Sequence, residues 1–91
     1  MISFNSEKRA RTLEERGLDF ADAALIFAGK TLTIEDDRED YGEVRYQSYG
    51  YLNDRLVMVV WTQRDEAQHI ISMRKCNARE QARVRHQLGG S

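Results

Sequence analysis

The chain has 91 residues, of which 41% are hydrophobic and 32% charged, and its formal net charge is −1. These values are typical of one small soluble globular domain, and they do not favour a protein that binds nucleic acid over its whole surface. No apolar run approaches the roughly 18 residues of a membrane span. The N-terminus also lacks the basic segment and apolar stretch of a secretion signal, so we expect a cytoplasmic protein.

The single cysteine and the last three residues give two further expectations about the domain. The single cysteine, Cys76, cannot form an intramolecular disulfide, which fits a reducing compartment. We expect residues 1–88 to form one domain, and the closing Gly89-Gly90-Ser91 to be a linker or an added tail.

The N-terminal part begins with Ile2 to Phe4, which is either a short first strand or a lead-in. Ser6 is a suitable N-cap and Gly17 a suitable C′ residue, so the spacing predicts a helix over residues 7–16. The apolar residues that share one face of this helix are Ala10 and Leu13.

A second helix is expected to follow the N-cap Asp19 and to end at Gly29. Its apolar residues recur at helical spacing, and they are Phe20, Ala23, Ala24 and Phe27. Such a stripe is typical of packing in a core rather than of a ligand site. Thr31 to Ile34 then alternates β-branched and apolar residues and predicts the start of the sheet.

An acidic stretch from Glu35 to Gly42 comes next, and we interpret it as an exposed loop. Its carboxylates are oxygen ligands of the kind that hard cations prefer. The stretch lacks the spacing of a calcium loop and has no histidine partner, so we predict no metal site there.

Three strands are predicted after this loop. Val44 to Leu52 alternates, so that one face carries Arg45, Gln47, Tyr49 and Tyr51. After a turn at Asn53-Asp54, the six apolar residues from Leu56 to Trp61 predict a strand buried on both faces. Residues 64–67 turn the chain into Gln68 to Arg74. This last strand is expected to place on one face Ile70 and Ser72, and on the other His69, Ile71 and Met73.

Asn77 begins the final helix, because Asn77 and Glu80 have the spacing of a capping box. The predicted fold is therefore α+β, with two N-terminal helices, a four-stranded antiparallel meander and a C-terminal helix.

Several kinds of chemistry find little support in the sequence. Cys76 has Lys75 beside it, but no third group is placed to orient His69 as its base, and a lone cysteine is more often packing. Zinc requires three or four ligands, and Cys76, His69 and His86 lack a recognised spacing. The chain also lacks a glycine-rich phosphate loop.

The remaining candidate for a functional site is a group of arginines with one carboxylate. Residues 69–86 are locally basic, with Arg74, Lys75, Arg79, Arg83 and Arg85 against Glu80 alone. Arg64 and Arg74 each end a predicted strand, and guanidinium groups hold phosphodiesters and stabilise a pentacovalent transition state. If both arginines gather beside Glu80, the cluster suits RNA cleavage without metal. The alternative, purely structural roles are surface salt bridges for the two arginines and helix capping for Glu80.

The order of several short motifs resembles the BrnT family of type II toxins. The motifs are F-N-x-x-K from Phe4, G-L-D-F-A-D-A from Gly17, G-E-V-R-Y from Gly42, V-V-W-T-x-R from Val59, I-I-S-M-R-K from Ile70 and A-R-E from Ala78. The resemblance implies a fold like that of RelE-type ribonucleases and RNA cleavage without metal that inhibits translation. It also implies neutralisation by a BrnA-type antitoxin, whose ribbon-helix-helix domain binds DNA and represses the operon.

By position in these motifs, the resemblance implies catalytic roles for Arg64, Arg74 and Glu80. It implies RNA contacts for Lys8 and Arg45, and the neighbouring basic side chains that we expect to assist are Arg16, Lys75, Arg79 and Arg83. Two departures matter. Arg16 stands where relatives have histidine, and Val84 where tyrosine is common, so two groups for proton transfer or base stacking are lost.

The leading hypothesis is a toxin endoribonuclease that needs no cofactor, with activity attenuated by these departures. Arg64 and Arg74 would clamp the scissile phosphate, and Glu80 would orient it or accept a proton. The alternative is a non-catalytic subunit that binds the antitoxin and acts as co-repressor. RNA preference and ribosome dependence are left open by the sequence.

Overall fold

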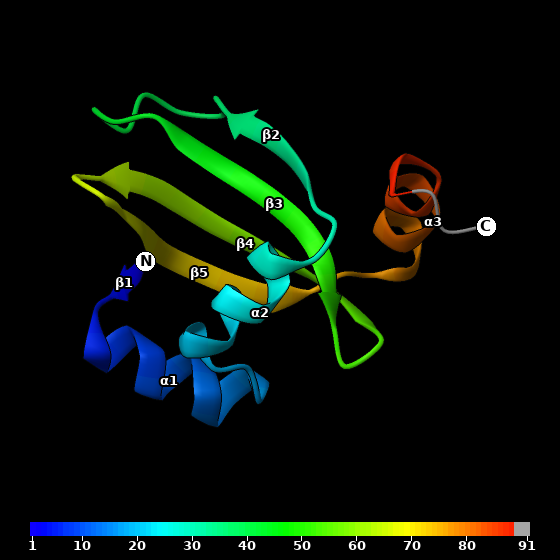
Figure 1. The fold of residues 1–91 in the computed structure, drawn as a ribbon, viewed down its shortest axis with the longest axis horizontal. Coiled ribbons are helices and arrows are strands. Elements are labelled where there is room, and N and C mark those ends of the chain that lie inside the picture. Colours follow the sequence, from blue (N-terminus) through cyan, green and yellow to red (C-terminus); the bar gives the residue numbers. More distant parts are fainter. Residues whose placement is uncertain (89–91) are drawn as a thin grey trace.

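The computed structural model describes residues 1–88, so the predicted linker at residues 89–91 lies outside the described residues. The elements in chain order are β1 (Ile2–Phe4), α1 (Ser6–Arg16), the 3-10 helix η1 (Phe20–Asp22), α2 (Ala23–Ala28), β2 (Leu32–Asp36), β3 (Arg45–Leu52), β4 (Arg55–Arg64), β5 (Ala67–Lys75) and α3 (Ala78–Gln87). The predicted α+β class is confirmed (Figure 1).

The sheet has five strands in the order β1-β5-β4-β3-β2, so the predicted four-stranded antiparallel meander is wrong in detail. Strands β2 to β5 do form antiparallel neighbours, but β1 adds a parallel partner to β5. Ile2 pairs with Gln68 and Phe4 with Ile70. This pairing joins segments more than sixty residues apart, which local sequence patterns do not report.

Helices pack against both faces of the sheet, because the buried residues of β4 alternate between two core clusters. Val57 and Val59 pack against residues of η1 and α2, on what we call the α1–α2 face. Leu56, Met58 and Val60 point the other way and share a cluster that includes Val84 and Leu88, on what we call the α3 face; the other buried members are Tyr49 and Cys76. The central part of the predicted strand is therefore buried on both sides, as expected.

The start of the first helix differs from the prediction. Asn5, not Ser6, is the N-cap, because its side-chain oxygen accepts hydrogen bonds from the backbone of Glu7 and Lys8, both at 3.0 Å. Gly17 does end the helix in the left-handed conformation, with φ of 68°. No residue of α1 is buried, and its apolar pair, Ala10 and Leu13, is exposed.

The second helix is shorter than expected. Asp19 does cap it, but it caps a turn of 3-10 helix, after which α2 has only six residues. Phe20 and Ala23 are fully buried as predicted, whereas Ala24 is exposed and Ile26 takes its place in the core.

Two strand boundaries and one face assignment also change. Strand β2 extends to Asp36, which is buried and paired with Arg38, so the acidic loop begins later than expected.

A register shift in the β4–β5 ladder leaves Ile71 without a direct partner, because Val60 pairs with Ser72 and Trp61 with Ile70. This irregularity brings Ile70 and Met73 into one core cluster, although the simple alternation placed them on opposite faces.

Candidate functional site

Arg64 and Arg74 project from the α3 face at opposite ends of the β4–β5 hairpin. Arg64 is opposite Ala67, beside the turn, whereas Arg74 is opposite Met58. Since Met58 and Arg64 are six positions apart along β4, the two arginine backbones are separated by about 20 Å. An even separation keeps them on one face. The predicted convergence of Arg64 and Arg74 on one phosphate is therefore wrong, because an antiparallel hairpin separates the ends of its two strands.

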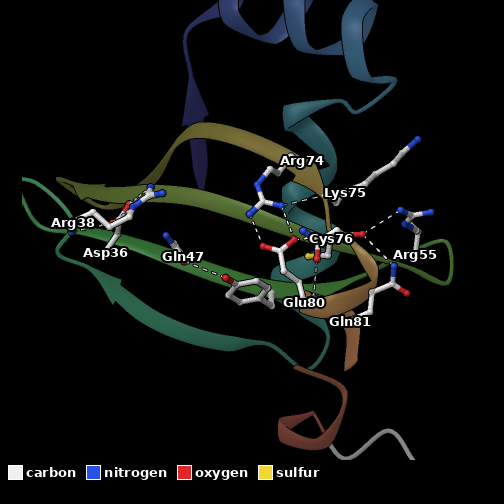
Figure 2. Close-up of polar contacts among 11 residues, drawn as sticks. Asp36, Arg38, Gln47, Arg55, Arg74, Lys75, Cys76, Glu80 and Gln81 are labelled. Carbon is white, nitrogen blue, oxygen red and sulfur yellow. Dashed lines mark hydrogen bonds and ion pairs between the residues drawn. The ribbon is translucent and has the colours of Figure 1, made fainter. Parts of the chain in front are cut away.

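Arg74 does lie beside Glu80, and the two form a two-pronged ion pair (Figure 2). Arg74 donates to Oε1 of Glu80 at 2.7 Å and to Oε2 at 2.5 Å. Oε1 also accepts the backbone N–H of Asn77 at 2.9 Å, which completes the predicted capping box. The hydrogen bonds from Arg74 lower the pKa of Glu80 to about 2. A carboxylate so weakly basic is a poor proton acceptor at neutral pH.

At the other end of the hairpin, Glu43 joins Arg64 to Arg45. Its carboxylate accepts from Arg45 at 3.1 Å and from Arg64 at 3.4 Å, and these partners lower its pKa, Arg45 most. Arg45 also lies over the ring of Tyr41, 4.0 Å from its centroid. Arg64 has 53% of its side chain exposed and only the longer of the two ion pairs, so its guanidinium is available to an anion.

An open hollow of about 720 Å³ lies beside Arg64. We call it the Arg64 hollow, and its lining residues are Met1, Ser3, Arg64, Asp65, Glu66 and Ala67. Strand β1 forms one wall and the β4–β5 turn another. The parallel strand that the sequence left undecided therefore helps to build the site.

His69 is a functional candidate that the sequence analysis set aside, because no group was placed to orient its ring. It pairs with Thr62 on β4 and with Ser3 on β1, and its Nδ1 shares a 2.9 Å hydrogen bond with the hydroxyl of Ser3. Burial is the main cause that lowers the pKa of His69, and Arg64 contributes in the same direction. This lowered pKa favours the neutral form of the imidazole, which can accept a proton. Its orienting partner is 66 positions away, so no local signal reveals it.

The remaining predicted residues lie on two helices and a strand end. Lys8 and Arg16 of α1 line a cleft beside β5, and Arg16 donates to the backbone carbonyl of Met73 at 2.7 Å. Lys75 is exposed at the end of β5, and the exposed basic residues of α3 include Arg79 and Arg83. The structure thus groups Lys8 with Arg16 and Arg74 with Glu80, and it links Arg45 to Arg64 through Glu43.

The structure also bears on a reactive thiol and on a metal site. Cys76 is fully buried, and burial raises the pKa of its thiol to about 11, so it is held as a packed thiol rather than a reactive thiolate. Within residues 1–88, no three His, Cys, Asp or Glu side chains are grouped to hold a metal ion. None of the helices in that range has the length and apolar character needed to cross a bilayer.

Comparison with known proteins agrees with the motif order. The family model described as "Ribonuclease toxin, BrnT, of type II toxin-antitoxin system" matches residues 4–80. A search of curated proteins finds no match to the chain. The matched segment runs from β1 through the first turn of α3 and includes Arg64, Arg74 and Glu80. The chain belongs to the BrnT family of ribonuclease toxins of type II toxin-antitoxin systems.

Proposed function

We propose that this protein is a metal-independent endoribonuclease toxin whose reaction centre is Arg64 with His69 on the α3 face. The observation that carries the proposal is the combination of an accessible guanidinium and a neutral, oriented imidazole on one face beside an open hollow. A cationic group and a proton acceptor are the two parts that RNA cleavage without metal requires.

In the proposed reaction, His69 accepts the proton of a ribose 2′-hydroxyl, and the oxygen attacks the adjacent phosphorus. The bond from phosphorus to the 5′-oxygen breaks, and that oxygen takes a proton from the imidazolium or from water. The products are a 2′,3′-cyclic phosphate and a 5′-hydroxyl. Arg64 stabilises the additional negative charge on the phosphorane, where removal of one such donor costs about 100- to 1000-fold in rate.

Arg74 is assigned a different role from Arg64, since Glu80 already occupies two of its donors. Its side chain is 40% exposed, so it binds a second phosphate of the same RNA strand while Glu80 fixes its position. Lys75, Arg79 and Arg83 extend the basic surface beyond it. The RNA would lie along β5, between α1 and α3.

The family supports an antitoxin as partner, and we propose a BrnA-like ribbon-helix-helix protein that covers the α3 face. The complex then binds DNA only through the antitoxin. The toxin acts in the cytoplasm by cleaving translated RNA, on or off the ribosome. This arrangement makes antitoxin binding and RNA binding mutually exclusive at Arg64.

The test is cleavage of RNA by the purified protein in EDTA. We expect the wild type to leave cyclic phosphate ends, and both Arg64→Ala and His69→Asn to abolish most of the activity. Lys30→Ala is the matched control, because Lys30 is an exposed cation on the α2–β2 connection, away from β5. Absence of cleavage by the wild type, together with tight antitoxin binding, would instead favour a non-catalytic co-repressor subunit.

A further inference from the structure

A second basic feature lies between α1 and the edge of β5. It is a cleft of about 210 Å³, which we call the α1–β5 cleft, and its lining residues are Lys8, Arg11, Thr12, Glu15, Arg16, Ile71 and Ser72. The five helical residues share one face of α1 because they recur at intervals of three and four positions. The lining thus carries three cations against a single carboxylate.

The strand order explains why the cleft exists. Strand β1 pairs with β5 only as far as Ile70, so the following residues of β5 have no neighbouring strand on that side. Helix α1 lies alongside this segment. Arg16 donates to the carbonyl of Met73 at 2.7 Å, which satisfies the strand edge and holds the guanidinium at the cleft.

Glu15 is the single acid among the residues that line the cleft, so the lining keeps an excess of positive charge. None of the ion pairs found within residues 1–88 involves Lys8, Arg11 or Arg16. The hydroxyls of Thr12 and Ser72 add two hydrogen-bond donors at the same place. This set of groups is suited to the non-bridging oxygens of a phosphate.

We propose that the α1–β5 cleft binds a backbone phosphate of the RNA strand next to the reaction centre. This inference rests on the proposed ribonuclease function, and it adds a subsite to which Arg11 contributes a cation. Because of the bulge at Ile71, the partners of His69, Ser72 and Arg74 on β4 are Thr62, Val60 and Met58, so each step along β5 corresponds to roughly 7 Å. An extended RNA strand along β5 therefore passes from His69 through the cleft to Arg74. Phosphate contacts of this kind give affinity without sequence preference.

The first measurement uses binding alone. A fluorescent 2′-O-methyl oligonucleotide, which cannot be cleaved, is titrated with wild type, Arg11→Glu and Lys30→Glu at several salt concentrations. We expect Arg11→Glu to weaken binding about tenfold and to reduce the slope of log K against log salt by about one. Lys30→Glu, with the same charge reversal on another surface, should have a much smaller effect. Both positions are exposed, so the fold is retained, and Lys8→Gln serves as a milder second variant.

The second measurement uses cleavage. The cleft would hold a substrate phosphate away from the reacting atoms. We therefore expect Arg11→Glu to raise KM and to leave kcat unchanged. Equal effects of Arg11→Glu and Lys30→Glu on both binding and KM would overturn the subsite. So would saturation of the cleft by inorganic phosphate with no loss of oligonucleotide binding, which would identify a free-anion site. A wild type that binds the oligonucleotide through Arg11 but cleaves no RNA would overturn the proposed function and leave the subsite standing.

Discussion

Arg74 and Glu80 join the last strand to the last helix through a two-pronged ion pair (Figure 2). Helix α3 is otherwise held on the sheet mainly by the buried side chains of Val84 and Leu88. The carboxylate that caps the helix is thus the same one that fixes the guanidinium of Arg74, for which we propose a contact with RNA. Docking of α3 and presentation of Arg74 are therefore coupled.

This coupling predicts a pH-dependent loss of stability in Glu80→Gln. Glutamine keeps the reach to the Asn77 N–H but removes the charge, so the variant isolates the ion pair. We expect a loss of about 1–2 kcal/mol in the free energy of unfolding at pH 7, below the full value of the pKa shift because Arg74 is partly exposed. Urea denaturation measures it.

The sign of the pH effect follows from the lowered pKa of Glu80, which moves from 4.5 to about 2. The stabilisation is complete above pH 4.5 and is lost as the pH falls towards 2. The difference between wild type and Glu80→Gln should therefore shrink at pH 3. Glu14→Gln, on the exposed surface of α1, is the control. A difference that stays constant with pH would contradict the ion-pair explanation.

A second prediction concerns the pH profile of RNA cleavage. Because the pKa of His69 is lowered from 6.5, the imidazole becomes a competent base below neutrality. We expect kcat/KM to rise with pH along an acidic limb whose midpoint lies below 6.5. In His69→Asn, which keeps a partner for Ser3, this acidic limb should disappear together with most of the activity. An unchanged limb in the variant would exclude His69 as the proton acceptor.

The parts of the fold that the sequence predicted correctly are those set by local chemistry. Asn77 and Glu80 are three positions apart and form the capping box, and Gly17 adopts the left-handed conformation that ends α1. The prediction that Ala10 and Leu13 form the inner face of α1 was wrong, because Arg9 occupies that side instead. Its guanidinium pairs with Asp19 at 2.7 Å and lies over the ring of Phe4. A long basic side chain covers the core there, which an apolar count does not detect.

The candidate site was predicted less well because it depends on pairing between distant strands. A two-residue turn after Arg64 sets the register of the β4–β5 hairpin. Once this turn is recognised, the separation between Arg64 and Arg74 follows from the lengths of the two strands. The orientation of His69 depends on Ser3, and β1 has no local signal that fixes its partner. The local grouping of Arg74 with Glu80 was therefore predictable, and the placement of Arg64 and His69 on one face was not.

A third prediction concerns the thiol of Cys76. It is fully buried on the α3 face, and burial raises its pKa to about 11. We expect the native protein to react with a thiol reagent at pH 8 far more slowly than the protein unfolded in urea. Rapid modification of the native protein at a rate equal to that in urea would mean that α3 does not remain docked on the sheet.

The packing of α2 on β3 gives a final prediction at Gly50. A Cβ added there would lie 2.7 Å from Cγ2 of Ile26 and 3.2 Å from Cγ2 of Thr31, so Gly50→Ala forces the buried Ile26 to move. We expect a loss of about 1–3 kcal/mol in the free energy of unfolding. Gly29→Ala is the matched control, because its nearest atom is a carbonyl oxygen at 3.8 Å and its φ is −98°. That variant should be neutral or more stable by about 0.4–1 kcal/mol. Equal stability of the two variants in urea would show that α2 is not packed against β3 as closely as these contacts require.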